Sequence, residues 1–184
     1  MIEADVFRVL LESLADEALI VANGYLSRRA FHCRDRSTTF YMVGSMGLAS
    51  SIGLGVALAR PERRVVVVDG DGNLLMSLGA LAMIANSDAK NLIHILIDNQ
   101  EYASTGGQRG VAMAEWPKLA LAAGYYSAFQ LTEELQLRLA LQQTSKQPGP
   151  AFLQVEVSTG IETSPRVGRQ PEEIAITFKN SLAS

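Results

Sequence analysis

The stretch RVVVVDGDGNLLMSLGALAMIANSDAKNLIHILIDNQEYASTGGQ, residues 64–108, contains two strand patterns separated by an acidic, glycine-containing turn. Val65 to Val68 and Leu92 to Ile97 are runs of mostly branched apolar residues, which is typical of strands buried on both faces of a parallel sheet. The segment from about Leu74 to Asn86 predicts one helix between them. In a right-handed βαβ unit both strand ends lie at the edge of the sheet where α/β proteins bind ligands.

The turn itself predicts a site for a metal ion and a phosphate. Gly70 and Gly72 allow a sharp turn and a close approach of the backbone to a ligand, and the following helix offers free N–H groups. Asp71 lies inside this turn and would repel a phosphate unless a cation lay between them. Because Mg²⁺ prefers oxygen ligands, we predict that Asp71, the amide oxygen of Asn99 and a backbone carbonyl at Glu101 bind it.

The spacing of the two side-chain ligands resembles a known motif. Asn99 follows Asp71 by 99 − 71 = 28 positions, and the thiamine diphosphate motif consists of GDG, a helix, a strand and then N-N. Here Asp98 replaces the first Asn, but the metal-binding second Asn is kept. Three further stretches are similar to the cofactor-binding domain of sulfopyruvate and phosphonopyruvate decarboxylases, and the resemblance covers nearly the whole chain: FYMVGSMGLASSIGLGVAL (40–58), DNQEYASTGGQ (98–108) and SRRAFHCRDR (27–36).

The resemblance implies a set of cofactor-binding residues. The Gly44 carbonyl would accept a hydrogen bond from the aminopyrimidine, and Met46 would lie beneath the cofactor and bend it. The alternative for Met46 is an ordinary core position, as we expect for Met76 and Met83, which are seven residues apart on the predicted helix. The full set of predicted cofactor-binding residues is Gly44, Ser45, Met46, Gly70, Asp71, Gly72, Asn73, Asn99, Glu101 and Tyr102.

Two other segments provide possible substrate contacts. By resemblance, the loop from Glu101 to Glu115 folds over the diphosphate and the substrate, with hinges at its paired glycines. Its candidate contacts are Ser104, Thr105 and Gln108, and Arg109 could add positive charge; an ordinary surface loop with a solvated arginine is the alternative. Ser27 and Arg28, at the end of the first strand, are further candidates, although Ser27 is also a good helix N-cap and Arg28 could be solvated.

A helix rich in small residues is predicted to end near Ala59. Gly53 and Gly55 lower its stability by roughly 1 kcal/mol each relative to alanine. A close approach to the sheet or to a partner helix would explain their presence.

Composition limits the possible classes of protein. Of the 184 residues 48% are hydrophobic, which is ample for one domain, and the charged fraction of 19% is low. One explanation is that another chain covers part of the surface. The net charge of −3 gives no basic footprint for nucleic acid. Cys33 is the only cysteine, which excludes an intrachain disulfide, and we assign it no catalytic role.

The expected location is the cytoplasm, without a membrane partner. The acidic, amphipathic start of the chain lacks the features of a signal peptide, and no apolar run approaches the roughly 20 residues that span a bilayer. His94 lies within an apolar strand, so we expect a hydrogen-bonded core histidine and not a catalytic one.

The alternation of strands and helices predicts an α/β fold. We expect one domain over residues 1–184, with a doubly wound, mostly parallel sheet of about six strands and helices on both faces. A dinucleotide-binding fold is the nearest alternative, but its G-x-G-x-x-G fingerprint needs a third glycine where this chain has Leu75.

The resemblance implies a thiamine diphosphate- and Mg²⁺-dependent decarboxylase of an acidic 2-oxoacid. In this family a glutamate from a pyrimidine-binding domain activates the cofactor, so we expect that residue on an α subunit or another domain and assign no certain catalytic residue to this chain. A chain that begins at Met1 favours the β subunit of a sulfopyruvate decarboxylase, which forms sulfoacetaldehyde and CO2. A phosphonopyruvate decarboxylase domain and a non-catalytic cofactor-binding module remain alternatives.

Overall fold

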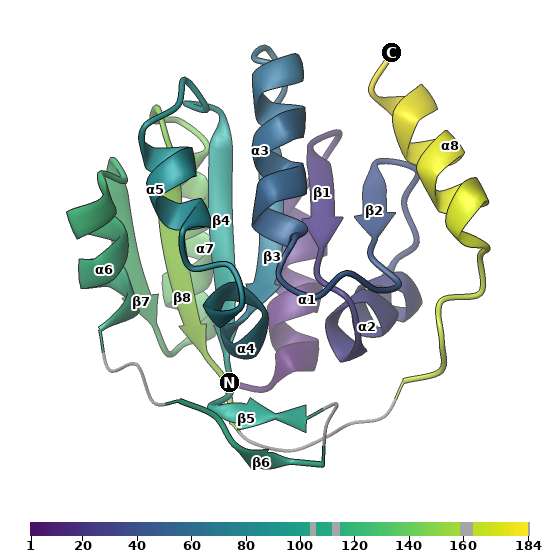
Figure 1. Cartoon of the computed structure of the whole chain (residues 1–184), viewed down its shortest axis with the longest axis horizontal. Helices are drawn as coiled ribbons and strands as arrows, with labels where there is room; N and C mark the ends of the chain where they lie inside the picture. The colour runs from purple at the N-terminus through teal and green to yellow at the C-terminus, as the bar shows by residue number, and fades with distance from the viewer. Residues whose placement is uncertain (104–105, 112–114, 159–163, 184) are drawn as a thin grey trace.

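A six-stranded parallel sheet forms the centre of the molecule. The computed structural model describes residues 1–103, 106–111, 115–158 and 164–183. The strands lie in the order β2-β1-β3-β4-β8-β7 (Figure 1), and every neighbouring pair is parallel. Their bounds are β1 Ala18–Val21, β2 Thr39–Tyr41, β3 Val65–Gly70, β4 Leu92–Asp98, β7 Ser127–Leu131 and β8 Ala151–Glu156. The predicted α/β class is confirmed, and the sheet is wholly parallel where we expected a mostly parallel one.

Helices cover both faces of this sheet (Figure 1). One face carries α1 Glu3–Ser13, α2 Tyr25–Cys33 and α7 Glu134–Thr144. The other carries α3 Ala49–Ala59, α4 Asp71–Leu75, α5 Ala80–Ala85 and α6 Trp116–Ala123, with α8 Pro171–Ser181 beside β2. A two-stranded antiparallel hairpin, β5 Glu101–Tyr102 with β6 Gln108–Arg109, lies outside the sheet. None of the helices in the described ranges is long and apolar enough to cross a membrane.

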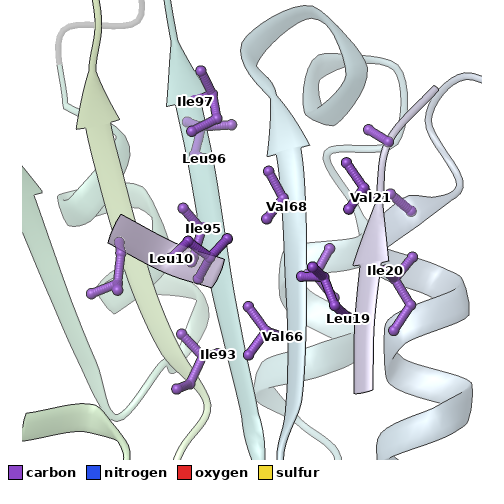
Figure 2. Packing of buried hydrophobic residues seen from close by; sticks show 14 of the residues in the cluster. Leu10, Leu19, Ile20, Val21, Val66, Val68, Ile93, Ile95, Leu96 and Ile97 are labelled. Carbon is purple, nitrogen blue, oxygen red and sulfur yellow. The ribbon is translucent and has the colours of Figure 1, made fainter. Parts of the chain in front are cut away.

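The apolar runs that predicted the central strands form the core. Figure 2 shows Leu10 of α1 in front of β4 near Ile95, whose register partner on β3 is Val68. On the opposite face α3 lies very close to the sheet, because a Cβ built at Gly53 would be 2.1 Å from Cγ2 of Val67. This contact explains one of the two glycines in α3 as a close approach to the sheet.

The predicted helix from Leu74 to Asn86 is wrong as a single element. The structure has two short helices, α4 and α5, joined by turns in which Ser77 N–H bonds to Leu74 O and Ala80 N–H bonds to Ser77 O. The chain bends here to pack against the loop before α3, since a Cβ at Gly47 would lie 3.0 Å from Met76 Cβ.

Because of this bend, the expectation that two methionines lie in the core is also wrong. The side chains of Met76 and Met83 are 63% and 66% exposed. A seven-residue spacing places two residues on the same face of an unbroken helix, but Met76 follows α4 and Met83 lies in α5.

Candidate functional site

The cleft lies where the direction of the sheet connections reverses. The chain runs from β1 outward to β2 and from β3 outward to β4, so a gap opens beyond the carboxyl ends of β1 and β3, where open α/β sheets bind ligands. A cavity of about 380 Å³ occupies this position. Its lining includes predicted cofactor and metal residues from both sides of the gap, namely Met46, Gly70, Asp71, Gly72, Asn73, Asn99, Glu101 and Tyr102.

The charged residues of the cleft are all acidic. Among the described residues that line it, Glu3, Asp71 and Glu101 carry carboxylates, and no Lys, Arg or His is present. Glu3 is already paired with Arg29, which lies outside the lining, at 3.0 Å. An anion such as a diphosphate therefore needs a cation between itself and this wall.

Asp71 offers the strongest single ligand for such a cation. It is 5% exposed, and its Oδ1 accepts a hydrogen bond of 2.7 Å from Gly72 N–H. Its Oδ2 is buried with no hydrogen-bond partner among the described residues. The pKa of Asp71 is raised to about 6, mainly by burial and also by the nearby carboxylate of Asp98, while the N–H groups of Gly72 and Gln100 act in the opposite direction. An unpartnered buried carboxylate oxygen is costly unless a metal ion binds to it.

Asn99 and Glu101 complete an oxygen-rich arrangement. Asn99 Oδ1 accepts a hydrogen bond of 3.0 Å from the N–H of Glu101, two residues further along the chain. Within the described residues no group of three or more His, Cys, Asp and Glu side chains could hold a metal. A Mg²⁺ ion bound by one carboxylate, one amide oxygen and one carbonyl, with its other positions left to ligand phosphates, fits these residues.

Tyr102 explains why Gly72 must lack a side chain. A Cβ at Gly72 would lie 2.7 Å from Cε1 of the Tyr102 ring. The ring therefore lies directly over the turn, and it is carried by the β5–β6 hairpin, in which Gly107 N–H bonds to Tyr102 O at 3.1 Å. The hairpin thus forms one wall of the cleft.

The loop between β2 and α3 brings Met46 to the cleft. Ser45 and Gly47 have positive φ angles of 58° and 93°, and Met46 is 39% exposed. Met46 Cε lies 3.6 Å from the position of a Cβ at Gly72, so this side chain points at the acidic turn. Gly44 and Ser45 flank it without lining the cavity, and their predicted contacts with the cofactor stay predictions.

The side chain of Asn73 is engaged within the protein. Its Oδ1 accepts from Gly47 N–H at 2.7 Å, and its Nδ2 donates to Asp69 Oδ1. Asn73 lines the cleft as predicted, but its amide group has partners on both sides. Its predicted cofactor contact therefore remains a prediction.

The structure corrects the prediction for the first strand end. The helix begins at Tyr25 after Gly24, so Ser27 is not its N-cap. Ser27 is 1% exposed, its hydroxyl hydrogen-bonds to the carbonyls of Val21 and Ala22, and it does not line the cleft. Arg28 places its guanidinium 5.1 Å from the ring centre of Tyr25 and does not line the cleft.

Two further residues considered as substrate contacts, Gln108 and Arg109, lie on the hairpin. Gln108 and Arg109 are exposed residues of β6 and do not line the cavity. Gly106 and Gly107 have φ angles of 119° and 74°, which suits the predicted hinge positions. Ser104 and Thr105 lie outside the described residues.

Sequence reasoning missed the contribution of the turn after β1. Asn23, Gly24, Tyr25 and Leu26 line the cleft, and Asn23 Oδ1 is buried without a partner among the described residues. Gly24 has a φ of 88° and precedes the N-terminus of α2, whose N–H groups favour anions. An Asn-Gly pair directly after a buried strand was the available signal.

The expected core histidine is confirmed. His94 is fully buried, and its Nδ1 lies 3.0 Å from the hydroxyl of Tyr125.

Comparisons with known proteins agree with this geometry. Residues 22–155 match the family model for the thiamine pyrophosphate enzyme, C-terminal TPP binding domain. The chain is 42% identical over 166 residues to sulfopyruvate decarboxylase subunit beta from Methanothermobacter thermautotrophicus, covering 90% of this chain and 86% of that protein. It is 40% identical over 174 residues to phosphonopyruvate decarboxylase from Streptomyces viridochromogenes, covering 94% of this chain and 44% of that protein.

A solved structure shows the same fold. Benzoylformate decarboxylase from Polynucleobacter necessarius matches 87% of this chain and 34% of its own, with a TM-score of 0.69. At 18% identity this likeness concerns the fold alone.

Proposed function

The chain belongs to the thiamine pyrophosphate enzymes through their C-terminal TPP binding domain, and from this premise we propose that it is the diphosphate-binding part of a Mg²⁺-dependent 2-oxoacid decarboxylase. The observation that carries the proposal is the buried, unpartnered Oδ2 of Asp71 in a cleft whose charged lining is acidic. Without a cation the acidic lining of the cleft repels a diphosphate, whereas a cation bound to Asp71 would allow the cleft to bind the diphosphate. Asp71, Asn99 and the carbonyl of Glu101 would hold the Mg²⁺.

Each part of the cleft has a role in binding. The N–H groups after Gly24 lie at the start of α2 and suit phosphate oxygens, whereas the unpartnered Oδ1 of Asn23 suits a hydrogen-bond donor or a cation. Met46 and the ring of Tyr102 supply apolar surface above and beside the turn. Thiamine diphosphate, when bound, supplies the thiazolium ring that takes up the electrons released as CO2 leaves a 2-oxoacid.

We propose an acidic 2-oxoacid as the substrate, with 3-sulfopyruvate first and 3-phosphonopyruvate as the alternative. The support is the pair of relatives at 42% and 40% identity, which bear the names of these two decarboxylases. The chain spans less than half of the phosphonopyruvate decarboxylase that it matches. Both substrates carry a compact anion on the same three-carbon skeleton, so a direct assay has to separate them.

The rest of the active site is proposed to come from a pyrimidine-binding subunit or domain. The M. thermautotrophicus relative is named as a beta subunit. On the face that carries α3, α5 and α6, the exposed apolar residues are Leu58, Met83 and Leu121 of these helices and Met46, Leu48 and Met76 of the segments next to α3 and α5 in the chain. Met46 and Met76 also line the cleft, so a partner on this face would adjoin the cofactor. Such a partner would supply the activating glutamate.

The test is an assay of CO2 release from 3-sulfopyruvate and 3-phosphonopyruvate. We expect release when the chain, a pyrimidine-binding chain, thiamine diphosphate and Mg²⁺ are all present, and loss of release with Asp71→Asn. Release by this chain alone would refute the shared active site. Tight cofactor binding without release of CO2 from either substrate, with any partner, would identify a non-catalytic module instead. Binding of NAD in place of thiamine diphosphate would refute the proposal as a whole.

A further inference from the structure

A buried chain of hydrogen bonds connects the acidic turn to the loop that carries Met46. We propose that Asn73, oriented by Asp69, is a positioning residue that holds Met46 where the cofactor binds. This inference rests on the proposed function, because the cofactor is its ligand. It is carried by two contacts: Gly47 N–H donates to Asn73 Oδ1 at 2.7 Å, and Asn73 Nδ2 donates to Asp69 Oδ1.

Asp69 determines which way the Asn73 amide points. A carboxylate only accepts hydrogen bonds, so the NH₂ group of Asn73 must face it. The amide oxygen then faces Gly47, where it meets an N–H donor. With the amide reversed, an oxygen would face the carboxylate and an NH₂ group would face an N–H, and both contacts would be lost.

Asp69 is itself held from the other side. It is fully buried, its Oδ1 accepts from Gly70 N–H at 3.1 Å, and its Oδ2 lies 3.4 Å from His94 Nε2. The hydroxyl of Tyr125 lies 3.0 Å from His94 Nδ1. Burial raises the pKa of Tyr125, so the phenol keeps its proton and can donate a hydrogen bond to Nδ1 of His94. In a neutral imidazole whose Nδ1 accepts, the hydrogen is on Nε2, which faces Asp69. The hydrogen bonds thus run from Asp69 through Asn73 to Gly47, and the His94–Asp69 contact behind them is a close approach only, since neither His94 Nε2 nor Asp69 Oδ2 has a hydrogen-bond partner among the described residues.

The loop at the end of this chain needs such support. Ser45 has a φ of 58°, which is unfavourable for a residue with a side chain, and Gly47 has a φ of 93° and is buried against Met76. Between them, Met46 extends toward Gly72. The Asn73 contact fixes the backbone next to Met46 at one defined point, so the cleft is preorganised before the cofactor arrives.

The test is a double-mutant cycle on thiamine diphosphate affinity. The dissociation constant is measured by equilibrium dialysis at saturating Mg²⁺ for the full chain and for Asn73→Ala, Met46→Ala and the double variant. We expect Asn73→Ala to weaken binding about tenfold, the loss typical of one hydrogen bond, and the double variant to bind within about twofold of Met46→Ala. A double variant whose loss is the product of the two single losses would overturn the proposal, as would full affinity in Met46→Ala.

Asn91→Ala is the matched control. The Asn91 amide donates to the carbonyls of Ala57, Arg60 and Arg63 at the opposite end of the strands. This variant should lower the thermal unfolding midpoint and leave the dissociation constant unchanged. A loss of cofactor affinity equal to that of Asn73→Ala would show a general effect of destabilisation and overturn the positioning role.

A measurement on the unaltered chain covers the case in which Asn73→Ala does not fold. The Gly47 amide should exchange slowly with deuterium in the cofactor-free protein, because its acceptor is a buried side chain. Exchange as fast as that of an exposed loop amide would overturn the inference. If the unaltered chain binds no thiamine diphosphate at all, the proposed function fails, which is distinct from an additive cycle in a chain that binds it.

Discussion

At the scale of single residues, Asp71 shows how a buried carboxylate lowers the stability of the folded chain. Its carboxylate is buried with one unpartnered oxygen, and burial raises its pKa to about 6. The folded chain therefore holds this proton more tightly than the unfolded chain does. The contribution of Asp71 to stability is favourable below about pH 4 and is lost as the pH rises to about 6.

Asp71→Asn should therefore stabilise the cofactor-free chain at neutral pH. We expect the free energy of unfolding at pH 7.5 to rise by about 1–3 kcal/mol, because the buried charge is removed while an oxygen remains for Gly72 N–H. At pH 4 the gain should nearly vanish. Urea unfolding without Mg²⁺ at both pH values measures this, and Asp88→Asn, at a side chain that is 93% exposed, is the control. Lower stability of Asp71→Asn at pH 7.5 would contradict the assigned burial cost.

The residues of the site differ in how far sequence could predict them. Asp71 and Asn99 were predicted from their spacing and both line the cleft, because parallel strand ends meet at one edge whatever the detailed packing is; their role as metal ligands stays a prediction. Ser27 was misassigned, because a serine near a helix start can bond backward to the strand carbonyls as well as cap the helix. The contact between Asn73 and Gly47 joins residues 26 positions apart through an irregular loop, and no local pattern marks it.

At the scale of elements, the two glycines of α3 have different surroundings. A Cβ at Gly53 would collide with Val67 of β3, whereas a Cβ at Gly55 meets no described atom within 4 Å. Gly53 thus allows the helix to lie on the sheet. Gly55 lowers helix stability with no contact to a described residue to explain it, which suits a position covered by a partner.

Alanine at these two positions should have opposite effects. Gly53→Ala should lower the free energy of unfolding by about 1–3 kcal/mol through overpacking, and Gly55→Ala should raise it by about 0.5–1 kcal/mol through helix propensity. Thermal or urea unfolding of the isolated chain compares them directly, each serving as the control for the other. Equal destabilisation by both would show that Gly55 also packs tightly.

The elements were predicted well where the apolar pattern was strong. The valine and isoleucine runs of β3 and β4 are buried along their length, so their strand assignment needed no tertiary information. The segment after β3 was predicted as one helix because its composition favours helix throughout. Its division into α4 and α5 depends on packing against the distant Gly47 loop, which the local sequence does not reveal.

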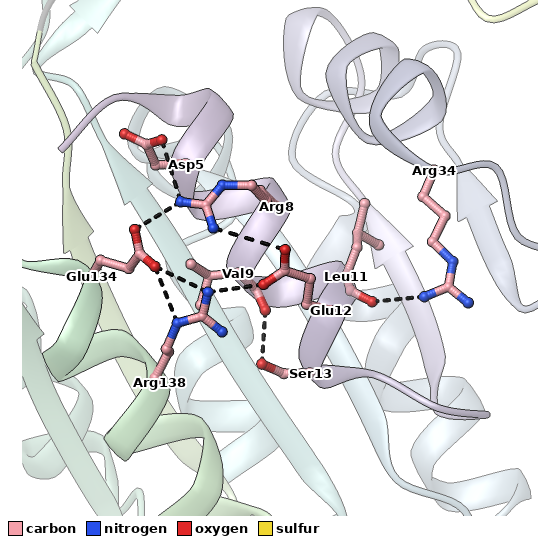
Figure 3. Close-up of polar contacts among 9 residues, drawn as sticks. All are labelled: Asp5, Arg8, Val9, Leu11, Glu12, Ser13, Arg34, Glu134 and Arg138. Carbon is pink, nitrogen blue, oxygen red and sulfur yellow. Dashed lines mark hydrogen bonds and ion pairs between the residues drawn. The ribbon is translucent and has the colours of Figure 1, made fainter.

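At the scale of the whole molecule, the two helical faces differ in chemistry. On one face α1 and α7 are joined by ion pairs, among them Arg8–Glu134 at 2.7 Å and Arg138–Glu12 at 2.8 Å (Figure 3). On the other face, Leu58 of α3, Met83 of α5 and Leu121 of α6 are exposed, and α7 on the first face exposes Leu135 and Leu139 beside its ion pairs. Exposed ion pairs contribute little to stability, but they suit a solvated surface, whereas an apolar face suits a partner.

Acidic substitutions on the two faces should separate association from folding. Leu58→Asp on α3 and Met83→Asp on α5, at side chains 49% and 66% exposed, should weaken binding to a pyrimidine-binding partner at least about tenfold. Leu139→Asp on α7, 56% exposed, is the matched control and should bind the partner normally. Analytical ultracentrifugation or calorimetry measures the affinity. Weakening by Leu139→Asp alone would place the partner on the other face.

The Mg²⁺ dependence of thiamine diphosphate binding tests the central claim most directly. The charged residues that line the cleft are acidic, so we predict that binding of a diphosphate requires a divalent cation held by Asp71 and Asn99. We predict saturable binding with Mg²⁺, and a loss of at least about a hundredfold in EDTA or in Asp71→Asn, in titrations followed by calorimetry. Undiminished binding in EDTA, or in Asp71→Asn, would contradict this account of the site.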